Sequence, residues 1–173
     1  MKMKVLAVLG APLLALVQAC GTVAYVPTEY PLREGLVAPI AAAGPVAFVN
    51  GQPSKEPTIM HSYGGTSLQS DYNAVTELMV QQAAREFAKA AQVGGGAKKT
   101  VELAVSSLNS DYSIFHWNSK IVFRARLGNG QAVDKQVTHG SGLNAIQDLN
   151  GCIAEGVMEL LKDPVMRAYF TAP

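Results

Sequence analysis

The segment FHWNSKIVFRARLGNGQ, residues 115–131, carries the clearest secondary-structure signal in this sequence. Apolar and polar residues alternate along it, which is the period of a β-strand with one buried face. We assign to the buried face Phe115, Trp117, Ile121, Phe123, Ala125 and Leu127. The opposite face carries His116, Lys120, Val122, Arg124 and Arg126. Asn129 and Gly130 favour a tight hairpin turn, so a return strand is predicted over residues 132–139.

Two more strands are predicted upstream of this hairpin. Val101, Leu103 and Val105 alternate with more polar neighbours, which indicates a strand with one buried face. A short strand at residues 46–49 is followed by the turn pair Asn50 and Gly51. Proline and glycine are frequent from there to residue 65, and HSYGGTS, residues 61–67, is interpreted as a flexible polar loop.

Two amphipathic helices are predicted from apolar residues at helical spacing. The first begins at Ser70 or Asp71 and runs to Gln92, before the glycines at 94–96. Its apolar face is Val75, Leu78, Met79, Ala83, Phe87 and Ala90. The second covers residues 143–162 and buries Leu143, Ile146, Leu149, Ile153, Val157 and Leu160. Its solvent stripe is predicted to be Asn144, Asp148, Glu155, Glu159 and Lys162, and residues 165–170 form a short final turn.

The order of these elements predicts an α+β fold. We expect an antiparallel three- to four-stranded sheet with two amphipathic helices packed on one face. After removal of the N-terminal segment discussed below, about 150 residues remain, the usual size of one domain. Residues 45–173 are therefore assigned to a single domain.

The N-terminal residues have the pattern of an export signal. Lys2 and Lys4 precede an apolar run over residues 5–17, and Val17 and Ala19 suit a small-x-small cleavage pattern. The run is shorter than the roughly 20 apolar residues that cross a bilayer, and Pro12 interrupts it. Residues 1–19 are therefore predicted to be a signal peptide.

Val17, Ala19 and Cys20 make this segment similar to a bacterial lipoprotein signal, in which a cysteine follows small residues. The resemblance implies a diacylglyceryl group on the Cys20 sulfur and acylation of its amine after cleavage. Two or more acyl chains give a stable membrane anchor. Gly21 rather than Asp after the cysteine implies the outer membrane, facing the periplasm. The alternative is ordinary cleavage after Ala19, which leaves a soluble periplasmic protein with a free Cys20.

Residues 20–44 are predicted to form the lipidated N-terminus and a tether, because they are rich in Ala, Pro and Gly. Fully extended, two dozen residues reach roughly 80 Å. The tyrosines and the apolar Leu36, Val37 and Ile40 leave a second alternative open, in which parts of the segment lie against the domain.

Charge and cysteine content exclude some functions. The chain has 14 Lys and Arg against 13 Asp and Glu, and loss of Lys2 and Lys4 leaves 12 against 13. Nucleic acid is therefore not an expected partner, because no strong basic field exists. With Cys20 alkylated, Cys152 has no cysteine to pair with, and we interpret it as a small buried apolar side chain.

No motif in the sequence predicts catalysis, a metal or a cofactor. His61, His116 and His139 lack the spacing of metal ligands. Ser67 follows two glycines, but Gln69 stands where a nucleophile elbow requires glycine. GGGAKKT, residues 94–100, follows a helix and precedes a strand, the reverse of a phosphate-binding loop. We therefore expect a protein that is not an enzyme.

The polar face of the long predicted strand supplies the candidate partner-binding residues Lys120, Arg124 and Arg126. Such a row of cations suits an acidic protein partner or the phosphates of lipopolysaccharide. The alternative is that these charges only keep a solvent-facing sheet soluble and discourage edge pairing.

The lipobox cysteine, the helix before the meander and the closing LLKDPVMRAYF resemble small proteobacterial envelope lipoproteins of the YajG type and auxiliary lipoproteins of envelope transport systems. The hypothesis that follows is a non-catalytic, membrane-tethered adaptor that binds an envelope protein in the periplasm. The alternative is an envelope hydrolase, or a carrier of a small ligand or lipid, with a pocket around His61, Tyr63, Trp117 and His139.

Overall fold

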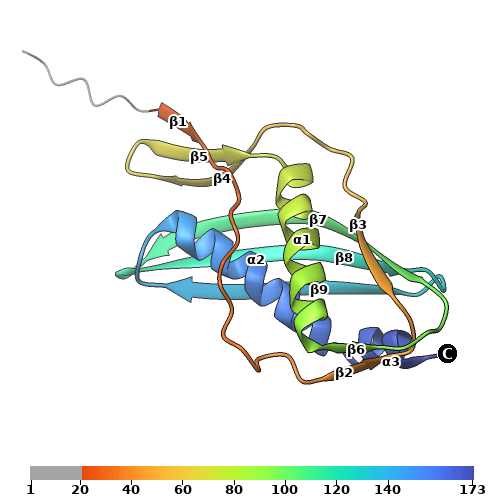
Figure 1. Cartoon of the computed structure of the whole chain (residues 1–173). Coiled ribbons are helices and arrows are strands. Elements are labelled where there is room, and N and C mark those ends of the chain that lie inside the picture. The colour runs from red at the N-terminus through yellow and green to blue at the C-terminus, as the bar shows by residue number, and fades with distance from the viewer. Residues whose placement is uncertain (1–20) are drawn as a thin grey trace, which may run out of the picture.

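In the computed structural model, residues 21–173 are described (Figure 1). The predicted signal peptide, residues 1–19, and the predicted lipidation site Cys20 lie outside the described residues. Within the described part, a seven-stranded sheet carries three helices on one face, and a two-stranded sheet lies at one end. No helix of this part is long and apolar enough to cross a membrane.

The large sheet is built around its longest strand, β7 (Lys99–Ser113). One edge of β7 pairs with β8 (His116–Leu127), and β8 pairs with β9 (Ala132–Ser141), both antiparallel. The other edge is shared: β3 (Val46–Asn50) pairs in parallel with the first part of β7, and β4 (Thr58–Tyr63) with its later part. Beyond β4 lie β5 (Thr66–Ser70), antiparallel, and β1 (Gly21–Ala24), parallel to β5.

The prediction of the sheet was therefore wrong in the number of strands and in their relative directions. The sheet is mixed and has seven strands, not three or four antiparallel ones, and three helices lie on it rather than two. The predicted hairpin and its preceding strand are present, but β7 extends through residue 113. The two strands of the β4–β5 hairpin lie where a polar loop was expected, and β1 lies where a tether was expected. Alternation of burial predicts a strand, but it does not say which neighbour the strand takes or in which direction.

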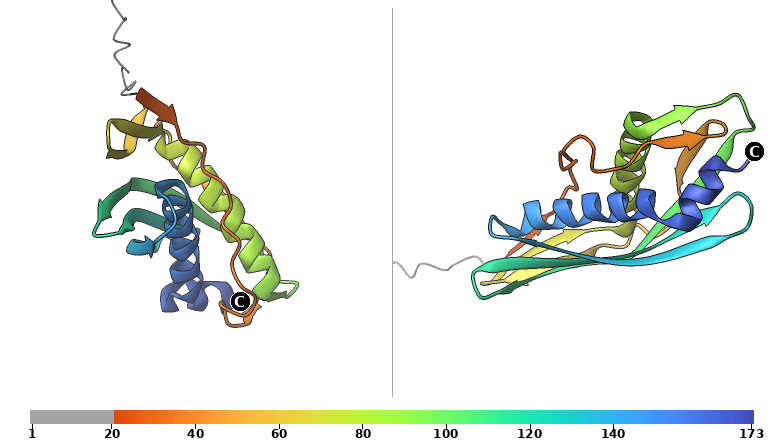
Figure 2. Two further views of the ribbon diagram at one scale, coloured as in Figure 1. Left: turned by 90° about the vertical axis from the view of Figure 1, so that its left-hand side faces the viewer. Right: turned by 90° about the horizontal axis from the view of Figure 1, so that it is seen from below.

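The three helices lie together on one face of the sheet, as Figure 2 shows from two sides. The first, α1 (Tyr72–Ala90), is capped at its N-terminus by Asp71, whose carboxylate accepts from Ala74 N. The second, α2 (Ala145–Lys162), begins at Asn144 and is buried on most sides. The third, α3 (Pro164–Thr171), was predicted only as a turn.

Asp163 joins α3 to the sheet. Its carboxylate caps α3 by accepting from Val165 N at 2.8 Å and lies 2.6 Å from Lys135 Nζ on β9. Burial by itself raises the pKa of this carboxyl, but the hydrogen bonds from Lys135, Met166 and Val165 outweigh it, so the pKa is lowered. The ionised form therefore holds the end of the helix in place.

The core lies between the sheet and the helices. Alternate residues of β7 and β8, including Leu103, Ile121 and Phe123, face the apolar sides of α1 and α2. Phe48, Phe87 and Phe170 bring β3, α1 and α3 together through edge contacts with centroids 4.9–6.3 Å apart. The predicted apolar face of α1 is buried from Val75 to Phe87. In α2 the prediction fails at its start, where Leu143 and Ile146 are exposed.

The segment between β1 and β2 lies against the domain, which is the second alternative left open for residues 21–44. Tyr25 is 2% exposed and donates through its hydroxyl to Asn150 Oδ1 on α2 at 2.7 Å. Gln82 Nε2 on α1 donates to Tyr30 O. The segment therefore crosses both helices, and we call residues 25–39 the strap (Figure 1).

The strap ends in β2 (Ile40–Ala42), which pairs in parallel with β6 (Ala91–Val93). The helix α1 thus ends at Ala90, and not at the glycines that follow, because the next residues are used as a strand. Gly94 lies so close to the neighbouring chain that a Cβ there would be 2.6 Å from Ala43 O. Glycine is needed at this position for close backbone contact rather than to stop the helix.

A polar side chain from α1 fills the gap between β3 and β4 on the edge of β7. Thr76 is fully buried, and its Oγ1 accepts from Val105 N at 3.0 Å and donates to Tyr72 O at 2.7 Å. Gln52 Nε2 donates to Val105 O. These side chains replace the missing strand, so the backbone groups of Val105 are satisfied.

We expect Thr76→Val to lower the free energy of unfolding by about 1–3 kcal/mol, because the buried N–H of Val105 loses its acceptor. Thr76→Ser keeps the hydroxyl, so its cost should be smaller, about 1 kcal/mol or less. Urea unfolding of the unlipidated protein measures both. Equal losses in the two variants would show that the hydroxyl contributes nothing.

Candidate functional site

Three aromatic side chains meet at the end of the sheet where β4, β7 and β8 lie side by side. The ring centroids of Tyr63 and Tyr112 are 4.9 Å apart, and those of Tyr112 and Trp117 are 4.7 Å apart. His61 packs edge-on against Trp117 at 4.9 Å. We call Tyr63, Tyr112 and Trp117 the aromatic row. The row exists because β4 pairs with the later part of β7, so its hairpin is brought beside the β7–β8 turn.

A groove of about 490 Å³ separates the aromatic row from the start of α2. Its walls come from β4, β5, β8 and the start of α2, and its lining residues are His61, Tyr63, Thr66, Leu68, Trp117, Asn144, Ala145, Ile146 and Gln147. Asn144 Oδ1 is already engaged in capping α2. The groove thus offers mainly apolar surface, which suits an apolar chain better than a polar substrate.

A buried polar cluster lies beneath α2, centred on Asp148. Its carboxylate is completely buried and accepts hydrogen bonds from Ser119 Oγ and from His139 Nδ1, the latter at 2.9 Å. Ser110 Oγ donates to the same carboxylate at 3.4 Å, and Ser110 O accepts from His61 Nδ1 at 2.7 Å. Each member is satisfied by another member, so the cluster ties the helix to the sheet.

The His139 ring lies directly against the backbone of α2 at Gly151. A Cβ at that position would be 2.5 Å from the His139 ring. Glycine is therefore required in the middle of this helix, despite its helix-weakening effect, so that the ring can reach Asp148. Tyr30 of the strap packs edge-on near the same ring, with centroids 6.2 Å apart.

This cluster does not form a catalytic triad, although it contains serine, histidine and aspartate. In a triad the histidine stands between the serine and the carboxylate, where it takes the serine proton. Here Asp148 stands between Ser119 and His139. The serine donates to a carboxylate instead, and its side chain is sealed from solvent. The chemistry of the cluster is structural.

The residues expected around a hydrolase pocket are only partly brought together. His61, Tyr63 and Trp117 do meet, as described above. His139 lies apart from them in the polar cluster, paired with Asp148. Within residues 21–173, no cluster of three or more His, Cys, Asp or Glu has the geometry to hold a metal ion.

The candidate partner-binding residues lie on the outer face of β8, opposite the helices. Arg124 donates two hydrogen bonds to Asp134 on β9, at 2.7 and 2.9 Å. These bonds lower the pKa of the Asp134 carboxyl and raise that of Arg124. Arg126 lies 3.9 Å from Glu102 on β7. This face of β8 is therefore a mixed-charge surface. Arg124 and Arg126 already have acidic neighbours, and Lys120 lies on the same face of the strand.

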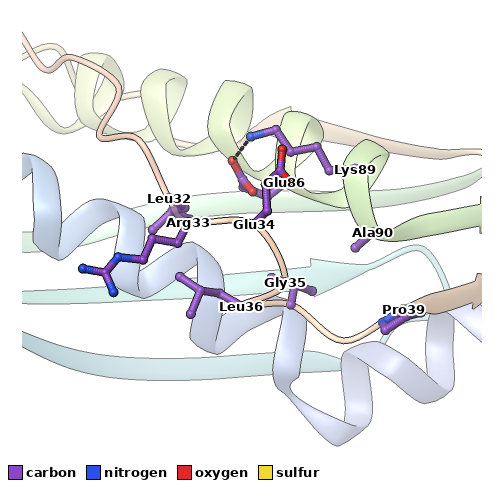
Figure 3. Close-up of a pocket in the computed structure, with 10 residues that line it drawn as sticks. Leu32, Arg33, Glu34, Gly35, Leu36, Pro39, Glu86, Lys89 and Ala90 are labelled. Atoms are coloured by element: carbon purple, nitrogen blue, oxygen red, sulfur yellow. Dashed lines mark hydrogen bonds and ion pairs between the residues drawn. The ribbon is translucent and has the colours of Figure 1, made fainter.

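A second cavity, of about 510 Å³, lies between the strap and the end of α1 (Figure 3). Glu86 and Lys89 line it from the helix and pair with each other at 2.8 Å. Arg33, from the strap, points away from both of them. Because Glu86 and Lys89 pair with each other and Arg33 points away from them, these groups form no shared binding site in this cavity.

Cys152 is a buried apolar side chain, as predicted. It is completely inaccessible and lies between α2 and the sheet. Burial, aided by the charge of Asp148, raises the pKa of its thiol to about 12. The thiol is therefore protonated at neutral pH and is not a nucleophile.

The polar cluster was missed because Asp148 was assigned to the solvent stripe of α2. Its position four residues after Asn144 looks exposed on a helical wheel, yet the opposing strands present Ser119 and His139 to it. The usable signal was Ser119, a polar residue on the apolar face of β8. Phe115 was also misplaced: it lies in the β7–β8 turn and is 86% exposed.

Comparison with known proteins gives little beyond this geometry. No protein-family model matches the chain, and no curated protein matches it either. Among solved structures, the chain is similar to a crystal structure of a Xanthomonas campestris protein described under the family model DUF330. The identity is 13%, the TM-score is 0.46, and the match covers 86% of this chain and 95% of that one.

We expect Cys152 to resist thiol reagents in the folded protein. In a Cys20→Ser variant it is the only thiol, and its reaction with Ellman's reagent should stay slow as the pH rises from about 7 to 9, where an ordinary exposed thiol ionises. Unfolding in urea should speed the reaction by about 100-fold or more. Rapid labelling of the folded protein would contradict the assigned burial.

Proposed function

We propose that this chain is a lipid-anchored, non-catalytic protein of the Gram-negative envelope, which binds another envelope protein at the periplasmic side of the outer membrane. The sequence of residues 1–20 supports the anchor: two lysines, a short apolar run and small residues before Cys20. The buried, mutually satisfied Ser, His and Asp side chains of the polar cluster support a binding role over catalysis.

The observation that carries this proposal is the position of Gly21. It directly follows Cys20 in the sequence, and it is already paired with Thr66 on β5. The strap and β1 are part of the folded domain. The residues that were expected to form a tether therefore put no free length of chain between the domain and Cys20. With Cys20 acylated, the domain would be held directly at the bilayer surface.

The outer face of the sheet supports the partner-binding part of the proposal. The helices of the described chain lie on the other face (Figure 2), and the outer face carries Lys120, Arg124 and Arg126. Because Arg124 and Arg126 have acidic neighbours, the surface would favour a partner with both acidic and basic groups. Exposed charges such as these, at the edge of a protein–protein interface, govern the rate and specificity of association more than the affinity.

Replacing the anchoring residue tests the first part of the proposal. Wild-type protein expressed in a Gram-negative host should incorporate radiolabelled palmitate and partition into the detergent phase. Cys20→Ser should lose both properties, whereas Cys152→Ser should keep both, because its thiol is buried. Unlabelled wild-type protein with a bare Cys20 amine would refute the anchor.

Charge reversal on the outer face tests the second part. Lys120→Glu combined with Arg126→Glu leaves the Arg124–Asp134 pair intact and should reduce crosslinking to an envelope partner by about tenfold. Lys162→Glu, on α2 at the opposite side of the sheet, is the control and should have no effect. Crosslinking in intact envelopes measures all three proteins, and equal recovery would exclude the outer face as the binding surface.

A further inference from the structure

The turn between β7 and β8 presents two large apolar side chains to solvent. Ile114 is 81% exposed and Phe115 is 86% exposed, the highest exposures among the large apolar residues of the described chain. The turn follows directly on the aromatic row, since Tyr112 pairs with Trp117 across the two strands. We call Ile114 and Phe115 the apolar tip.

The backbone of the apolar tip is unfavourable for these residues. Ile114 has φ +38° and Phe115 has φ +68°, and they are the non-glycine residues with positive φ in residues 21–173. The equivalent turn between β4 and β5 uses Gly64 and Gly65, at φ +59° and +81°. A β-branched residue in this region is a rare outlier, so the tip costs folding free energy that Asn-Gly would not.

We propose that the apolar tip inserts into the bilayer to which the protein is anchored. This inference rests on the proposed function, because it takes the membrane beside Cys20 as the occupant. The tip then serves as a second, non-covalent contact that fixes how the domain stands on the membrane.

Gly21, the residue that follows the proposed anchor Cys20, lies at the same end of the sheet as the apolar tip. Gly21 pairs with Thr66, Thr66 pairs with Tyr63, and Tyr63 packs on Tyr112. Gly21 is thus three strand spacings from β7, or roughly 14 Å. Figure 1 shows the start of β1 and the turns of both hairpins on the same side of the molecule. Acyl chains on the residue before Gly21 would enter the same membrane surface.

At this end of the sheet the side chains change from fully apolar at the turn to aromatic and polar further along the strands, which matches the change in polarity across a membrane surface. Ile114 and Phe115 form the turn itself, and the aromatic row lies behind them on the strands. Tyrosine and tryptophan prefer the interface between headgroups and acyl chains, whereas isoleucine and phenylalanine prefer the hydrocarbon. Leu143, just before α2, is also exposed at this end, since the neighbouring Ser141 pairs with Trp117. The exposed carboxylate of Asp111 would limit the depth of insertion.

The single tryptophan of the sequence provides the test. Lipidated protein is reconstituted into vesicles of phosphatidylethanolamine and phosphatidylglycerol, with brominated acyl chains as quenchers. Trp117 emission should shift to shorter wavelength and be quenched by the brominated lipids. The unlipidated Cys20→Ser protein, titrated with the same vesicles, should bind weakly but show the same quenching.

The matched variant combines Ile114→Asn with Phe115→Gly. It should unfold at a higher urea concentration, since the turn strain is relieved, yet lose the quenching of Trp117 in both forms. Vesicle binding of the unlipidated form should fall about tenfold or more, because the variant no longer transfers two large apolar side chains from water into the bilayer. Asn129→Ala, in the turn at the other end of β8, is the control and should leave quenching unchanged.

The outcomes separate this inference from the proposed function. Quenching of the unlipidated protein without palmitate incorporation in cells would refute the anchor but retain the tip. Palmitate incorporation with Trp117 unquenched in wild type would overturn the tip. If the wild type sediments as a dimer and the Ile114→Asn, Phe115→Gly variant as a monomer, the proposal is also overturned, because the tip would then join two copies of the chain.

Discussion

The structure depends on the strand β7 and on how its second edge is divided. At fifteen residues it is the longest strand described, and it pairs with β8 along nearly its whole length. On its other edge β3 and β4 both run parallel to it, with a gap between them. Thr76 and Gln52 close that gap by hydrogen bonding to Val105. Without the division, the β4–β5 hairpin would have no place beside the β7–β8 turn.

The division creates two ends with different chemistry. At the β3 end, α3 packs against the start of β7, where Tyr169 Oη accepts from Thr100 N and Gly128 N. At the β4 end, aromatic side chains from three strands converge and the described chain begins. The polar cluster around Asp148 joins α2 to this second end. The positions of Gly21, the groove and the apolar tip all follow from the way β3 and β4 share the second edge of β7.

The sequence predicts most of the local structure because local patterns encode it. The β8–β9 hairpin, the short strand β3 and both long helices follow from periodicity, turn residues and caps. Strand neighbours do not, because a parallel pairing such as β3 with β7 joins segments about fifty residues apart and leaves no local trace. The buried polar cluster was harder still to predict from the sequence. Asp148 was placed in solvent, although its burial depends on Ser119 and His139 from other elements.

The pairing of β1 also determines how the domain would bear a pull from its N-terminus. The four residues of β1 run parallel to β5 and away from the β4 end, so tension on Gly21 acts along the strand axis. All the hydrogen bonds of that pairing are then strained together in shear instead of opening one at a time. Behind them, Tyr25 is held to Asn150 and Glu29 to Arg85. A pull applied through the N-terminus would load this series of bonds before it disturbed the core.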